Sequence, residues 1–195
     1  CGATFPGPEY GVDRVVPRFD HAMDTAARRL VGVLVTHGHE DHVGAVGELA
    51  LAVREAGVAP LRVWGPAYAL ELCQRRCAEA RLGRGDVEMH VVAPGARFDA
   101  GPFVVEPIRM THSIVDATAL CIDSAAGRLI HSGDYKLDPH PSDGQLTDVA
   151  RLEQLGDEGV RLLLADSTNA LRAGSTGSEQ DVAHELARVV AETKG

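Results

Sequence analysis

The sequence contains no long hydrophobic run and no dense set of cysteines. No apolar stretch approaches the roughly 18 residues that a membrane-spanning helix needs, and no segment resembles a signal peptide, so we expect no membrane association. The four cysteines form no C-x-x-C pair, which argues against a disulfide framework and fits a reducing cytoplasm. Cys73 and Cys77 lie four residues apart in a predicted helix, where burial explains them better than metal binding does.

Aromatic residues and positive charge are also scarce. Aromatic side chains make up 4% of the 195 residues, so the core has to be built mainly from Val, Leu and Ala. The chain has 19 Lys and Arg against 28 Asp and Glu, a net charge of −9, which argues against nucleic-acid binding through general positive charge. Four arginines of residues 75–84 are expected on a solvated helix face rather than on a phosphate backbone. Local attraction stays open, because two divalent cations would concentrate positive charge at one point.

The densest polar feature is the motif HGHEDH at residues 37–42, which directly follows a short apolar run. Side chains two positions apart in an extended segment point the same way, so His37 and His39 can bind one ion. Asp41 and His42 come after a turn and are displaced toward a neighbouring position, where a second ion can bind. Imidazole nitrogen and carboxylate oxygen favour zinc, with manganese as the substitute where oxygen ligands dominate. The alternative, a polar loop with chance histidines, is disfavoured by the density of the motif.

Short apolar runs alternate with longer amphipathic segments along the chain, a pattern typical of an α/β fold. Helices are predicted at residues 43–56, at residues 66–82 and after the N-cap Ser178, with Asp181 three residues further on. Strands are predicted at residues 30–35, 61–64, 87–92, 103–110, 117–122, 128–131 and 160–165, with a hairpin turn at residues 124–127. Together these elements predict a sheet-rich α/β sandwich with helices outside, and they place the histidine motif at the C-terminal end of a strand.

Two later strand ends supply further side chains of the ligand type. One predicted strand runs into His112, and a later one runs into Asp134. Catalytic zinc typically has three protein ligands and one position for water, so His37, His39 and His112 would make one such site. Asp134 could then bridge this ion to the second one. Each residue alone has an ordinary alternative, since His112 could be a plain strand-end histidine and Asp134 a turn former.

The order of these motifs is similar to a known family. HGHEDH, a later histidine after a strand and GDYK at residues 133–136 resemble the metallo-β-lactamase superfamily. Further segments resemble ribonuclease J of the β-CASP group: Cys-Gly at 1–2, Phe-Pro at 5–6, THSIVDA at 111–117, GDYKLDPHPSDG at 133–144 and DSTNA at 166–170. The resemblance covers essentially the whole chain. It implies the αββα sandwich of the metallo-β-lactamase fold, present here in part.

The resemblance assigns metal ligands residue by residue: His37, His39 and His112 for one zinc ion, Asp41 and His42 for the other, and Asp134 as the bridge. It therefore implies a centre of two zinc ions, with manganese as a substitute. Asp41 is implied to orient or deprotonate the attacking water. Asp166, which opens DSTNA, matches an acidic residue that helps to position a downstream histidine. The alternative for Asp166 is to cap the turn that follows it.

The resemblance also implies a domain organisation and an activity. Residues 1–173 are expected to form the N-terminal portion of a metallo-β-lactamase domain and residues 174–195 the start of a β-CASP domain, with the last zinc ligand and the leaving-group acid beyond Gly195. The implied substrate is RNA, hydrolysed by 5′-to-3′ exonuclease or endonuclease action in a cytoplasmic, homo-oligomeric full-length protein. Three rivals remain: a DNA-directed β-CASP nuclease, a thioesterase of the glyoxalase II kind, which has no need of DSTNA, and a non-catalytic module of the same fold.

Overall fold

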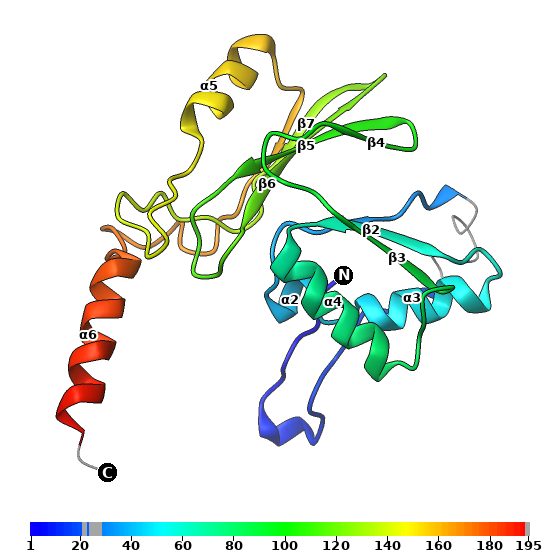
Figure 1. Cartoon of the computed structure of the whole chain (residues 1–195), viewed down its shortest axis with the longest axis horizontal. Coiled ribbons are helices and arrows are strands. Elements are labelled where there is room, and N and C mark those ends of the chain that lie inside the picture. The colour runs from blue at the N-terminus through cyan, green and yellow to red at the C-terminus, as the bar shows by residue number, and fades with distance from the viewer. Residues whose placement is uncertain (21–22, 24–28, 194–195) are drawn as a thin grey trace.

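The strands form two sheets in the computed structural model, which describes residues 1–20, 23 and 29–193 (Figure 1). The first sheet is parallel and has the order β1 (Val33–Leu34), β2 (Leu61–Gly65) and β3 (Val87–Val91). The second has the order β4 (Phe98–Ala100), β5 (Phe103–Arg109), β6 (Thr118–Ser124), β7 (Gly127–His131) and β8 (Leu162–Leu164). It is antiparallel except for the β7–β8 pair.

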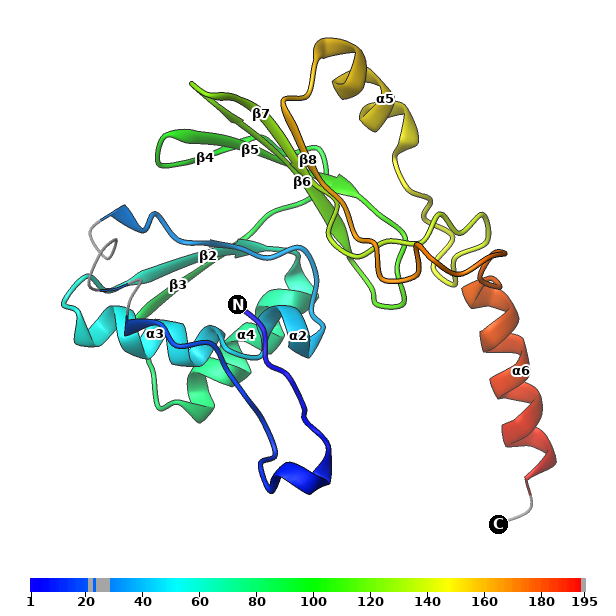
Figure 2. The same cartoon turned by 180° about the vertical axis from the view of Figure 1, so that it is seen from behind.

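The longer helices follow the strands and cover the outer faces of the sheets (Figures 1 and 2). They are α3 (Val46–Glu55) and α4 (Ala67–Glu79) on the first sheet and α5 (Val149–Glu158) on the second, while α6 (Glu179–Glu192) points away from both. Of two short helices, α2 (Glu40–Val43) adds the buried Val43 to the core between the helices and the first sheet, whereas η1 (Pro8–Tyr10) has no buried residue. Among the described helices, none has the length and apolar character needed to cross a membrane.

Three apolar clusters separate four layers. They include Val63 and Cys73 between the helices and the first sheet, Trp64 and Val105 between the two sheets, and Ile108 and Leu155 between the second sheet and α5. Val63 and Trp64 are neighbours in β2, so alternation along the strand sends one side chain into each cluster. The layer order is therefore helix, sheet, sheet, helix, which agrees with the predicted αββα sandwich.

The predicted cysteine pair lies in the first of these clusters. Cys73 is 0% exposed and Cys77 5%, as the sequence predicts. Burial raises the pKa of Cys73 to about 12 and that of Cys77 to about 11. Both thiols are therefore neutral core side chains rather than reactive groups.

Several element boundaries differ from the prediction. The predicted helix at residues 43–56 corresponds to α3, which begins only at Val46 because the chain leaves helical geometry at Ala45 (φ −112°, ψ 15°), and Val43 ends the separate helix α2. The predicted strand at residues 30–35 is paired only at Val33–Leu34. Strand β4 and helix α5 were not predicted, although Asp148 caps α5 by accepting from the N–H of Arg151. The hairpin at residues 124–127 and the Ser178–Asp181 capping box are confirmed.

Strand direction brings distant polar residues to one edge of the sandwich. Because β5, β7 and β8 run in the same direction, their C-terminal ends meet at one edge of the second sheet. The segment after β1 is fastened there, since the carbonyl of Thr36 accepts from both the N–H (2.9 Å) and the hydroxyl (3.0 Å) of Thr118 at the start of β6. Residues that follow β1, β5 and β7 are therefore neighbours.

Candidate metal centre

Four histidines converge at this shared edge. His37 and His39 follow β1, His42 lies in α2, and His112 follows β5. The ring centroid of His37 lies between 4.0 and 4.9 Å from the centroids of the other three rings. Four imidazoles this close bring several nitrogen atoms that can act as metal ligands into one small volume.

Ligand atoms at this edge form two groups, in each of which all atoms lie within 4.8 Å of one another: His37, His39, His112 and Asp134 in the first, and Asp41, His42 and Asp134 in the second. His112 Nε2 lies 3.1 Å from His39 Nδ1. His42 Nε2 lies 3.3 Å from Asp134 Oδ1. Two ligand atoms that bind the same tetrahedral zinc ion, each at about 2.0–2.1 Å from it, lie about 3.3 Å from each other. The spacing therefore suits one divalent ion in each group, with Asp134 common to both.

His37 is the most deeply buried of these residues, at 1% exposure. Its Nδ1 lies 3.0 Å from the Thr36 hydroxyl, whereas its Nε2 is buried and has no hydrogen-bond partner among the described residues. Burial first, and then the neighbouring histidines, lowers the pKa of His37 to about 3. A proton on Nδ1, donated to Thr36, leaves Nε2 as an electron-pair donor. A buried nitrogen in this state is unfavourable without a partner, and a metal ion is the partner that fits.

The turn at Gly133 places Asp134 against the histidines. Gly133 has φ +61°, and a Cβ atom there would lie 2.9 Å from the Thr118 carbonyl oxygen, so glycine is required. The carboxylate of Asp134 then lies 4.0 Å from His37 Nε2 and 3.8 Å from His112 Nε2. Burial, followed by the effect of a neighbouring imidazole, also lowers the pKa of His112. Both rings therefore offer nitrogen lone pairs at neutral pH.

The remaining ligand-type residues lie on α2, which has only four residues. Asp41 is the most solvent-exposed, with a side chain 66% exposed and an Oδ2 atom 3.6 Å from His42 Nε2. An ion pair between Glu40 and Arg76 joins the start of α2 to α4. At the C-terminal end of α2, Arg14 donates a hydrogen bond of 2.8 Å to the backbone carbonyl of Gly44. These two contacts were not predicted, because no spacing pattern in the sequence links partners this far apart.

Asp166 lies at the end of β8 and belongs to neither ligand group found among the described residues. Its Oδ1 accepts from the N–H (2.9 Å) and the hydroxyl (2.6 Å) of Thr168, and its own N–H donates to Ser132 Oγ (3.0 Å). The Thr168 hydroxyl is the main cause that holds the pKa of Asp166 below its usual value. These contacts are those of the turn-capping alternative, and the catalytic role stays a prediction.

Comparison with known proteins agrees with this geometry. The family described as the beta-lactamase superfamily domain matches residues 6–162. The chain belongs to the beta-lactamase superfamily. The crystal structure of the metallo-β-lactamase-fold protein YhfI from Bacillus subtilis superposes with a TM-score of 0.51 at 19% identity, over 71% of this chain and 50% of that one. The metallo-β-lactamase fold predicted from the sequence is therefore confirmed.

Curated relatives of this superfamily member include ribonucleases J. The enzyme of Sinorhizobium meliloti is 39% identical over 197 residues, covering 100% of this chain and 33% of the relative. That of Thermus thermophilus is 39% identical over 196 residues, covering 100% and 34%. The predicted resemblance to ribonuclease J is confirmed, and the chain spans about a third of the length of these relatives.

Proposed function

We propose that the chain carries the metal centre of a two-metal-dependent ribonuclease that hydrolyses RNA phosphodiester bonds. The observation that carries the proposal is the pair of ligand groups that share Asp134 beside the buried Nε2 of His37, which has no hydrogen-bond partner in the described part of the chain. The 39% identity to ribonucleases J over the whole chain supports RNA as the substrate. The metallo-β-lactamase fold and its cluster of metal-ligating side chains do not depend on which substrate the protein cleaves.

The proposed ligands are those of the two groups: His37, His39 and His112 for one ion, Asp41 and His42 for the other, and Asp134 between them. Three imidazoles favour zinc, and the oxygen-richer second group tolerates manganese. When bound, two such ions would supply Lewis acidity toward the phosphoryl oxygen atoms.

The buried and the exposed side chains of the centre have different proposed roles. His37 is enclosed and oriented by Thr36, so it provides a fixed internal ligand. Asp41 faces solvent and can accept a proton from the attacking water. We therefore propose that the RNA backbone approaches from the Asp41 side. The RNA backbone and the chain, with its net charge of −9, are both negative, so the attraction for RNA would come from the positive charge of the bound ions.

The proposal includes the expected domain organisation. Residues 1–173 would form the N-terminal portion of the metallo-β-lactamase domain, and residues 174–195 the start of a β-CASP domain. The separation of α6 from the sandwich supports a change of unit in this region (Figure 2). The last two residues of that range lie outside the described part of the chain. The cytoplasmic location, the homo-oligomer and the role of Asp166 stay predictions.

A combined metal and substrate assay tests the proposal. The full-length protein is analysed for bound metal and is offered 5′-monophosphorylated RNA, single-stranded DNA of the same sequence and a glutathione thioester. Two bound zinc ions together with cleavage of the RNA are expected. Two bound zinc ions with cleavage of the thioester or the DNA alone would contradict the assignment. His184→Ala, at an exposed position of α6, is the control for a histidine outside the centre.

A further inference from the structure

Helix α6 is attached to the described chain mainly through polar contacts at its N-terminus. None of its side chains is buried, and it points away from both sheets (Figures 1 and 2). Its N-cap Ser178 donates to the carbonyl of His140 (2.7 Å), and Lys136 Nζ donates to Glu179 Oε1 (2.6 Å). A helix without a packed face takes its orientation from such contacts.

Asp138 is the central residue of this junction. Its side chain is 1% exposed. One carboxylate oxygen accepts the N–H of Glu179 at the start of α6 (2.7 Å), and the other accepts the N–H of His140 (2.9 Å). The Glu179 N–H is the main cause that holds the pKa of Asp138 below its usual value, so both oxygens act as acceptors. A buried carboxylate shared in this way fixes two chain segments relative to each other.

The loop that contains Asp138 also carries Asp134 and is fastened to the segment before His112. The N–H of Lys136 donates to the carbonyl of Thr111 (2.9 Å), and the hydroxyl of Thr111 donates to the carbonyl of Lys136. The same hydroxyl accepts the N–H of Asp138 (3.3 Å). Thr111 is 4% exposed, so these bonds are shielded from water.

We propose that Asp138 is a positioning residue that couples the seating of α6 to the placement of His112 and Asp134. The inference rests on the proposed metal centre, because these two side chains belong to its ligand groups. The path is short: it runs from the Glu179 N–H through Asp138 to Thr111, which directly precedes His112. A part of the protein that moves the N-terminus of α6 would therefore alter both ligand groups.

Asp138→Asn tests the coupling with little change in shape. The N–H groups of Glu179 and His140 bind different oxygen atoms of Asp138, and the amide keeps only one of these as an acceptor, so one of the two donors loses its partner. Asp148→Asn is the matched control, because Asp148 caps α5 through one bond to the N–H of Arg151 (3.0 Å), which Asn retains. Glu179→Gln is a second, milder variant that removes the ion pair with Lys136 from the α6 side alone.

Hydrogen exchange in the full-length protein, freed of metal, measures the coupling without any metal. Asp138→Asn is expected to accelerate exchange at the N–H that faces the amide nitrogen, that of Glu179 or that of His140, and also at the N–H of Lys136, each about tenfold or more, the order expected for a lost hydrogen bond. Glu179→Gln should accelerate Lys136 exchange by a smaller factor, and Asp148→Asn should leave it unchanged. Unchanged exchange at Lys136 in both junction variants would overturn the proposal.

Titration with Co²⁺ alone, followed by visible absorption, measures the effect on the ligand groups. Asp138→Asn is expected to weaken Co²⁺ binding about tenfold or more, the range found for groups that orient metal ligands, while Asp148→Asn retains wild-type affinity. Equal affinity in both variants would contradict the coupling. A wild-type protein that binds no Co²⁺ would instead refute the proposed metal centre, and the exchange measurement would then decide the coupling by itself.

Discussion

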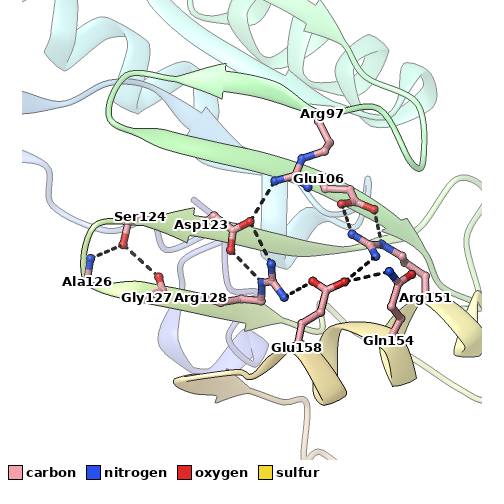
Figure 3. Close-up of polar contacts among 10 residues, drawn as sticks. All are labelled: Arg97, Glu106, Asp123, Ser124, Ala126, Gly127, Arg128, Arg151, Gln154 and Glu158. Atoms are coloured by element: carbon pink, nitrogen blue, oxygen red, sulfur yellow. Dashed lines mark hydrogen bonds and ion pairs between the residues drawn. The ribbon is translucent and has the colours of Figure 1, made fainter.

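Replacing Arg151 by Met is expected to lower the free energy of unfolding by about 2–3 kcal/mol. Arg151 lies on α5 and donates two hydrogen bonds to Glu106 of β5, from Nε to Oε1 (2.7 Å) and from Nη2 to Oε2 (2.8 Å) (Figure 3). The Glu106 side chain is 8% exposed, and Arg151 is its sole hydrogen-bond and ion-pair partner among the described residues. The substitution therefore leaves a buried carboxylate without a donor.

The magnitude follows from the burial of the pair. Removing one partner of a fully buried ion pair costs about 3–5 kcal/mol. The Arg151 side chain is 21% exposed, so water reaches the pair and the lower value applies. Glu106→Met should cost only about 1 kcal/mol, because Arg151 stays near Glu158 (3.8 Å) and solvent. In the double variant neither charge is stranded, so its loss should be smaller than the sum of the single losses by about 2 kcal/mol.

Urea denaturation followed by tryptophan fluorescence measures these values. Trp64 is the single tryptophan, is 8% exposed and lies in the cluster between the sheets, on the side of the second sheet opposite α5. It therefore reports global unfolding without contacting the substituted pair. A loss below about 0.5 kcal/mol for Arg151→Met, the range of an exposed pair, would refute the reasoning. Additive losses in the double variant would refute it as well.

Three further predictions concern the metal centre and acid stability. His39→Ala is expected to lower bound zinc and abolish hydrolysis while far-ultraviolet circular dichroism stays unchanged; full turnover at matched metal content would contradict the ligand assignment. Arg76→Met removes the ion pair with Glu40 and should weaken metal binding by the α2 group about tenfold in chelator competition, with Arg75→Met as the control that should bind normally. Asp123→Asn should reduce the loss of thermal stability on acidification, because an arginine hydrogen bond holds the pKa of Asp123 below its usual 3.8, so its stabilising effect is complete above that value and disappears as the pH falls through the folded pKa. If the melting temperatures of the variant and the wild type fell by the same amount from about pH 6 to about pH 2, this contribution would be excluded.

Local sequence signals predicted the layers and the place of the centre. Residues 61–64 form a strand as predicted, and their side chains point alternately into two apolar clusters, one on each face of the sheet. The spacing of His37 and His39 predicted two rings on one side, and the structure brings both into one group with His112. The short β4 strand gave no comparable signal, because three residues are too few to define a period.

Long-range polar contacts could not be predicted in this way. Arg76 was expected on a solvated helix face, yet it pairs with Glu40, which lies 36 residues earlier. Asp138 reads as a turn residue before proline, yet it is buried and binds the N-terminus of α6. In both cases the side-chain type is ordinary for a surface, and only the three-dimensional approach of two elements leaves Arg76 partly buried and Asp138 buried.

The origin of the ligands links metal binding to folding. His37 and His39 follow a strand of the first sheet, whereas His112 and Asp134 follow strands of the second. An unfolded chain does not hold these side chains together, so a cation binds the packed sandwich in preference to the unfolded state. At a metal concentration of 100 times Kd, such binding adds about 2.7 kcal/mol to the free energy of unfolding. The buried nitrogen of His37, which has no hydrogen-bond partner within residues 1–20, 23 and 29–193, is therefore unfavourable for the metal-free fold alone, and the folded state that it suits best is the metal-bound one.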